Sequence, residues 1–165
     1  MILDVLPNKL LPSSTRNNLI MALGNLAADS PLIKDQIIMK NGIDVLTTVF
    51  YTLEDRRSCE NCAWAISNLG RRSNNNRQIS SIHMKKICEC IGDIFKMQVI
   101  SLKKYDHTAD LLWTIANISE SGRKGIQLVI DQQIMKYVMK YASDNSNYEL
   151  QTPALRIIGN FSTGN

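Results

Sequence analysis

The chain has 165 residues, 44% of them hydrophobic and 21% charged, which is enough apolar material to bury a core and excludes a globally disordered chain. Its net charge of +4 is too small a surplus to be typical of a dedicated nucleic-acid-binding protein. No apolar run approaches the ~18 residues of a membrane span. The N-terminal stretch has no basic region and carries Asp4, unlike a signal peptide. These features predict a protein of the cytoplasm and nucleus with reduced thiols.

Helical patterns follow one another along the chain. Ser30 followed by Pro31 is a typical helix start, and Asn41-Gly42 is a typical stop. Helices are expected over Pro31–Asn41, Ile43–Leu53, Arg123–Gln133, Ile134–Ala142 and Tyr148–Phe161, with a loop at 143–147. The Ile, Val and Thr residues at 43–49 also fit a strand, but no matching alternation recurs elsewhere in the chain.

Four segments repeat one pattern, and each contains an Asn at the same place. They are LIMALGNLAADS (19–30), CAWAISNLGRRS (62–73), LLWTIANISESG (111–122) and ALRIIGNFSTGN (154–165). The intervals between the Asn residues are 43, 49 and 43, a period typical of armadillo and HEAT repeats. Three helices per period favour armadillo repeats. The longer middle interval indicates a six-residue insertion, which we expect in the polar stretch Arg71–Gln78.

The predicted fold is therefore an all-α armadillo-repeat solenoid, a right-handed superhelix of three-helix repeats. The chain holds about 3.5 repeats in a single domain, with segments at 1–29, 30–72, 73–121 and 122–165. One repeat cannot bury its apolar face alone, so the repeats must stack. One helix of each repeat lines the inner surface of such a stack, and that surface suits an extended peptide.

Two tryptophans share a helix face with an Asn one turn later: Trp64 with Asn68, and Trp113 with Asn117. At these residues the chain resembles importin α, the armadillo adaptor that binds nuclear localisation signals. The segments ALGNLAADS, WAISNLGR, ADLLWTIANIS, IQLVID and TPALRIIGNFSTGN resemble its central repeats in order. The resemblance implies a non-enzymatic binder of Lys/Arg-rich signals on cargo proteins, with no cofactor and no metal.

In that family, Asn amides clamp the peptide backbone, Trp faces hold Lys and Arg stems, and acids take the charged ends. The resemblance implies that Asp29 pairs with the key lysine of the signal. It implies peptide-binding roles for Asn25, Asp29, Asn61, Trp64, Asn68, Arg71, Asp106, Asp110, Trp113, Asn117 and Asn160. Arg156 also matches the family, which has Arg in that repeat.

Several positions depart from the family pattern. Met21 stands where the first Trp is expected, Asn117 replaces a usual Tyr, and Glu120 replaces an Asp. Met can pack against an alkyl stem but lacks the π face, so the pocket beside Asp29 should be weaker. No basic, importin-β-binding segment precedes the repeats, so importin β is not an expected partner. Nucleic acid and membranes are not expected partners either.

Structural roles are the alternative interpretation of these residues. The four Asn residues can instead cap helices or bridge adjacent repeats. Asp29 can join Ser30 in capping the following helix, and Asp106 and Asp110 fit a solvated helix face. The alternative function is accordingly a generic armadillo scaffold, or a degenerate importin α fragment without signal binding.

The Cys and His residues allow a third interpretation, a metal or enzyme site. Cys59 and Cys62 have a zinc-ligand spacing, and Cys88, Cys90 and His83 follow. Both Cys pairs fall within helical patterns, however, and Cys88 and Cys90 are two apart, so they point away from each other. No catalytic set of Ser, His, Asp or Cys converges in the sequence, so we expect neither a metal nor an enzyme.

Overall fold

The computed structural model describes residues 2–53, 55–71, 79–101 and 107–164. Within these residues every regular element is an α-helix, which confirms the predicted fold class. The helices are α1 (Ile2–Val5), α2 (Ser13–Asp29), α3 (Pro31–Met39), α4 (Gly42–Phe50), α5 (Arg56–Gly70), α6 (Ser81–Ser101), α7 (Thr108–Ser119), α8 (Arg123–Asp131), α9 (Met135–Ala142) and α10 (Tyr148–Thr163). No helix in this described part is both long and apolar enough to cross a membrane.

Local signals in the sequence set the breaks between helices. The Ser30 hydroxyl accepts a hydrogen bond from the backbone N–H of Ile33 at 3.4 Å, and Pro31 is the first residue of α3, as predicted. Asn41 separates α3 from α4 with a φ of 60°. Gln133 separates α8 from α9 with a φ of 54°. A residue in the left-handed backbone conformation thus separates α3 from α4 and, in the last repeat, α8 from α9.

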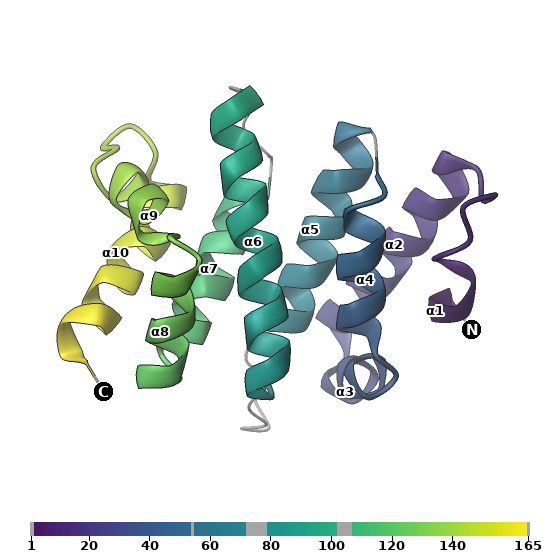
Figure 1. The fold of residues 1–165 in the computed structure, drawn as a ribbon, viewed down its shortest axis with the longest axis horizontal. Helices are drawn as coiled ribbons and strands as arrows, with labels where there is room; N and C mark the ends of the chain where they lie inside the picture. Colours follow the sequence, from purple (N-terminus) through teal and green to yellow (C-terminus); the bar gives the residue numbers. More distant parts are fainter. Residues whose placement is uncertain (1, 54, 72–78, 102–106, 165) are drawn as a thin grey trace.

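Four long helices form one row. α5 packs on α2, α7 packs on α5, and α10 packs on α7. Helices outside the row cover its other side, where α4 contacts α5 and α6, and α6 contacts α8. Figure 1 shows α4 and α6 nearer the viewer than α2 and α7, with the two ends of the chain at opposite ends of the molecule. The structure is therefore a stack of repeats, in which each repeat contacts mainly its neighbours.

The middle repeat differs from those beside it. Its described residues contain a single outer helix of 21 residues, α6, whereas α3 and α4 are separate helices in the preceding repeat. Lys86 pairs with Asp44, the Tyr51 hydroxyl donates to Asp93 at 2.7 Å, and both contacts join residues 42 apart. These contacts fix the register of α6 on α4. The six-residue insertion was expected at Arg71–Gln78, of which 72–78 lie outside the described residues.

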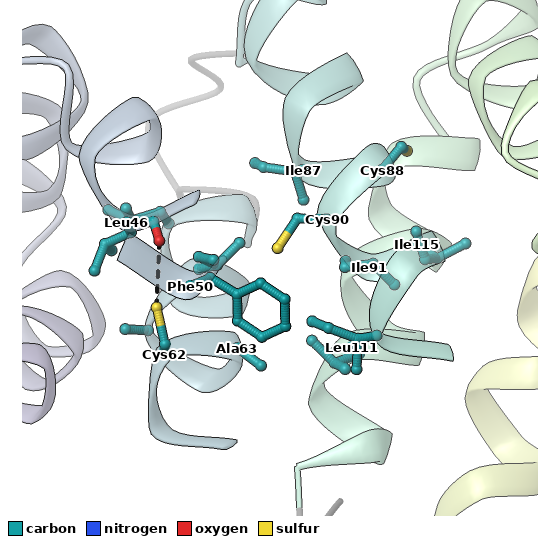
Figure 2. Close-up of a cluster of buried hydrophobic side chains, with 14 of the residues drawn as sticks. Leu46, Phe50, Cys62, Ala63, Ile87, Cys88, Cys90, Ile91, Leu111 and Ile115 are labelled. Atoms are coloured by element: carbon teal, nitrogen blue, oxygen red, sulfur yellow. Dashed lines mark hydrogen bonds between the residues drawn. The ribbon is translucent and has the colours of Figure 1, made fainter. Parts of the chain in front are cut away.

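The apolar core runs continuously through the repeats. In the centre of the molecule, side chains from α4, α5, α6 and α7 pack together (Figure 2). They are all buried and include Leu46, Phe50, Cys62, Ala63, Ile87, Cys88, Cys90, Ile91, Leu111 and Ile115. The Cys62 thiol lies 3.3 Å from the carbonyl oxygen of Leu46. Three of the four cysteines therefore serve as small apolar residues of the core.

Burial also controls the chemistry of these thiols. Loss of hydration raises the pKa of the Cys88 thiol to about 12 and raises the pKa values of Cys62 and Cys90 well above the ordinary range. Cys59 is only half-buried, and burial raises its pKa less. Because the thiolate is the reactive form, the core cysteines are poor nucleophiles and poor metal ligands in the folded chain.

We predict that a thiol reagent at pH 8 modifies only Cys59 readily in the folded protein. The other three cysteines should react only after unfolding, since they are buried and held as thiols. The measurement is the number of protein thiols that react with a chromogenic disulfide reagent, with and without denaturant. A Cys59→Ala variant is the control and should show almost no rapid reaction. Rapid reaction of two or more thiols in the native wild type would contradict this core.

Candidate functional site

The repeated segments place two side chains of each long helix on a common face. We call this the ladder face, made by Met21 and Asn25 on α2, Trp64 and Asn68 on α5, Trp113 and Asn117 on α7, and Arg156 and Asn160 on α10. The two members of each pair are four residues apart and so occupy the same side of their helix. Stacking of the long helices then brings the pairs next to one another.

The side chains at the first position of each pair differ in exposure. Trp113 is 40% exposed and Met21 is 36% exposed. Trp64 is partly buried because its ring lies against Gly24 of α2. The ring of Trp64 also lies 5.9 Å from the ring of His107, centroid to centroid. Trp113 is therefore the aromatic side chain of the ladder face with the most accessible surface.

The Asn residues divide into two groups. Asn68 is 1% exposed, and its amide donates to the carbonyl oxygen of Gly24 at 3.2 Å. The amide of Asn160 donates to the carbonyl of Ala116 at 3.0 Å and to the hydroxyl of Ser119. These two amides bridge adjacent repeats, as the structural alternative expects.

Asn25 and Asn117 form the second group. Asn25 is exposed and Asn117 is half-buried. Neither side chain has a hydrogen-bond partner among the residues that the structure describes. Both amides are therefore available to a ligand.

Asp110 is the centre of a small charged cluster at the start of α7. Its carboxylate pairs with the guanidinium of Arg71, which follows the end of α5, and lies 3.4 Å from the imidazole of His107. The Asp110 side chain is 25% exposed and the Arg71 side chain is 45% exposed. Asp110 and Arg71, which the sequence predicts as peptide-binding residues, thus lie in contact with each other. The chain's own arginine occupies the position where a cationic ligand would be expected.

The remaining predicted residues lie at separate points. Asp29 is the last residue of α2 and is exposed, while Ser30 alone provides the cap of α3. The Asn61 amide donates to the side-chain oxygen of Asn17 at 2.8 Å, which joins α5 to α2. Asp106 lies outside the described residues.

A pocket opens at the C-terminal end of the ladder face, between α7 and α10. Its volume is about 410 Å³. Arg156 and Glu120 form an ion pair across it with an N–O distance of 2.9 Å. The lining residues are Ser119, Glu120, Arg156, Gly159, Asn160 and Thr163. The pocket therefore presents a polar surface carrying both signs of charge.

Lys34 is a site residue that sequence reasoning missed. It is 5% exposed on α3, and its ammonium donates to the backbone carbonyl of Arg71. Burial lowers the pKa of this lysine. Its contact holds the end of α5 in place beside Asp110. No signal in the sequence separates Lys34 from an ordinary surface lysine, because its burial depends on the neighbouring repeat.

The structure gives no support to a metal centre among the residues it describes. Within those ranges no group of three or more His, Cys, Asp or Glu side chains converges. Cys59 and Cys62 lie on α5, while Cys88 and Cys90 lie on α6 with their thiols in the core.

Two known proteins have amino-acid sequences similar to that of this chain. The chain is 26% identical to importin subunit alpha-1b of Oryza sativa subsp. japonica over 159 residues, which is 94% of this chain and 28% of the rice protein. It is 24% identical to importin subunit alpha-2 of Caenorhabditis elegans over 144 residues, 85% of this chain and 25% of that protein. The chain thus spans about a quarter of the length of these relatives. No family model matches it.

Solved structures confirm the armadillo architecture. A designed armadillo repeat protein in complex with the peptide (KR)4 matches 99% of this chain and covers 64% of that protein, with a TM-score of 0.76 and 15% identity. Computationally designed armadillo repeat proteins for modular peptide recognition match with the same coverage, a TM-score of 0.78 and 17% identity. At these identities the match establishes the fold.

We predict that Gly24→Leu destabilises the protein, because a Cβ atom at Gly24 would come within 2.3 Å of the Trp64 ring. Such overpacking typically costs about 1–3 kcal/mol of unfolding free energy. Gly159→Ala on α10 is the matched control, since nothing lies within 4 Å of a Cβ there. That variant should gain up to about 1 kcal/mol from helix propensity. Urea unfolding of dilute samples measures both, and equal stabilities would contradict the packing of Trp64 on Gly24.

Proposed function

We propose that this chain, an armadillo-repeat protein similar to importin α, binds an extended Lys/Arg-rich peptide along its ladder face. The peptide would be a segment of nuclear-localisation type on a cargo protein, and the chain would act as an import-adaptor-like binder in the cytoplasm and nucleus. The observation that carries the proposal is the grouping on α7 of a 40%-exposed Trp113 with Asp110 and Asn117.

The chemistry of this group fits a basic peptide. A Lys or Arg stem can lie on the Trp113 ring, where a cation gains about 0.5–2 kcal/mol. The Asp110 carboxylate can accept the charged end. The free amide of Asn117 can supply one donor and one acceptor to the peptide backbone. The Asn amide contacts only the peptide backbone and the Trp ring contacts only the basic side chains. The Lys and Arg residues of the peptide would therefore determine specificity.

The Arg71–Asp110 pair supports a cation site at this position. Asp110 already holds a guanidinium from the neighbouring repeat, so its surroundings accommodate a planar cation. A peptide cation must either displace Arg71 or share the carboxylate with it. Since both partners are partly exposed, the internal pair itself is worth little, about 0–1 kcal/mol.

The N-terminal end of the ladder face completes the proposed binding surface. Asp29 and Asn25 are both exposed on α2, with Met21 one turn before Asn25. Asp29 can take a second ammonium group, while Met21 offers packing without a π face. Asn68 and Asn160 hold the helices in register and are not proposed as peptide ligands, and Trp64 contributes only the exposed part of its ring.

The relatives supply independent support for this class of ligand. Two importin α subunits are 26% and 24% identical to this chain, and one designed armadillo protein of the same fold is known in complex with (KR)4. The proposed affinity is modest, because the amides of Asn68 and Asn160 are used between repeats and a ladder binds less tightly when it has fewer rungs.

We predict that a fluorescent lysine-rich peptide binds the wild type and loses affinity on Trp113→Ala or Asp29→Lys. Trp113→Ala should weaken binding about 2- to 30-fold through loss of the cation–π contact. Asp29→Lys replaces an attractive charge by a repulsive one and should weaken binding about 10-fold or more. Fluorescence anisotropy at low salt measures both dissociation constants.

Two control variants separate the ladder face from nonspecific effects. Asp131→Lys on α8 makes the same change in net charge as Asp29→Lys, and Leu32→Ala removes an exposed apolar side chain from α3. Both should bind like the wild type. Equal affinity in all five proteins would contradict the proposal, and undetectable binding by a folded wild type would favour the generic scaffold.

A further inference from the structure

Two basic side chains of the chain itself lie beside the carboxylate of Asp110. The Nδ1 atom of His107 is 3.4 Å from Oδ2 of Asp110, while the guanidinium of Arg71 pairs with Oδ1. Each oxygen of this carboxylate therefore has one basic neighbour within the chain.

The imidazole of His107 also contacts an aromatic residue of the ladder face. Its ring centroid lies 5.9 Å from that of Trp64, and the two ring planes are tilted by 35°. Trp64 belongs to α5 and His107 immediately precedes α7, so the contact joins two adjacent repeats. One imidazole thus lies beside an aromatic ring and a carboxylate, the two kinds of group proposed above to hold a basic side chain of the peptide.

The backbone of His107 is held by the first turn of α7, whereas its side chain is not. The His107 carbonyl accepts a hydrogen bond from the backbone N–H of Leu111 at 3.1 Å. The imidazole makes no capping hydrogen bond to the helix and is 31% exposed. Side-chain rotation alone can therefore move the imidazole off the Trp64 ring without unwinding α7.

We propose that His107 is a specificity-determining residue of the peptide site, because it covers the Trp64 ring and one oxygen of Asp110. It would thereby direct the basic side chains of a peptide to the ring of Trp113. This inference rests on the peptide binding proposed above. A Lys or Arg stem reaches the Trp64 ring only by displacing the imidazole, whereas the 40%-exposed ring of Trp113 has no aromatic neighbour among the described residues.

The charge of the imidazole sets how strongly it competes with the peptide. Histidine side chains in general gain a proton as the pH falls from 8 to 5. A protonated His107 would hold Asp110 by charge and Trp64 by cation–π attraction, as a cation of the peptide would. Acid conditions should therefore favour the chain's own occupant over the peptide.

The described charged groups around His107 come from two helix ends. Asp110 lies in the first turn of α7, and Arg71 follows α5. The ammonium of Lys34 on α3 reaches this cluster only at the backbone carbonyl of Arg71. Asp106 lies outside the described residues.

Variants of His107 and Trp64 test this role with the same fluorescent lysine-rich peptide, by anisotropy at low salt and pH 7.5. His107→Ala uncovers the Trp64 ring and should bind the peptide about 2- to 5-fold more tightly than the wild type. Trp64→Leu keeps an apolar side chain against Gly24 but removes the π face. It should change the wild-type affinity little and should cancel the gain in the His107→Ala background.

The pH dependence of binding tests the contribution of charge. The wild-type affinity should fall about 2- to 5-fold between pH 7.5 and pH 5.5, whereas His107→Ala should bind almost equally at both. His83→Ala is the matched control, since it removes the other of the chain's two histidines. His83 lies on α6 and lines a pocket with residues of α3, so its variant should respond to pH like the wild type.

The outcomes distinguish this inference from the proposed function. Equal affinities of wild type and His107→Ala at pH 7.5, or an equal loss in both at pH 5.5, would overturn the role of His107 and leave peptide binding in place. Binding by His107→Ala alone would support both, because the imidazole would then block the face. Undetectable binding by every variant, with helices intact by circular dichroism, would overturn both.

Discussion

Close approach between consecutive long helices is the constraint on which the structure depends. Gly24 lies under the Trp64 ring with no room for a Cβ atom, and the Asn68 amide reaches the Gly24 carbonyl at 3.2 Å. The Asn160 amide makes the equivalent hydrogen bond to the Ala116 carbonyl between α10 and α7. Small residues at the crossing points set the spacing of the repeats, and the spacing in turn sets how far apart the ladder side chains stand. The proposed recognition of an extended peptide would therefore depend on residues that do not touch the peptide.

The sequence predicted the fold well and the site only in part. The period of the four Asn segments placed the long helices correctly, and Ser30 with Pro31 marked a helix start that the structure confirms. Helical spacing assigns residues to a face but does not tell which part of that face the next helix covers. For this reason Asn68, a predicted peptide ligand, is buried, while Asn25 at the equivalent position is exposed. The burial of Lys34 depends on the neighbouring repeat, so it could not be predicted from the local sequence either.

Charge on the ladder face is balanced locally. The net charge of +4 gives a basic peptide no long-range attraction, so the few exposed carboxylates must provide it. Two of the described acids near the face are already paired within the chain, Asp110 with Arg71 and Glu120 with Arg156. Asp29 is exposed at the end of α2, so the ammonium group of a bound peptide could reach it from solvent.

The position of α7 between two helices of the row also has a consequence for how stability is distributed. In a linear array the free energy is roughly a sum over repeats and the interfaces between them. α7 packs on α5 on one side and on α10 on the other. We therefore expect the backbone amides of α7, and those of the core around Phe95 and Ile91, to exchange with solvent only through the largest opening of the molecule.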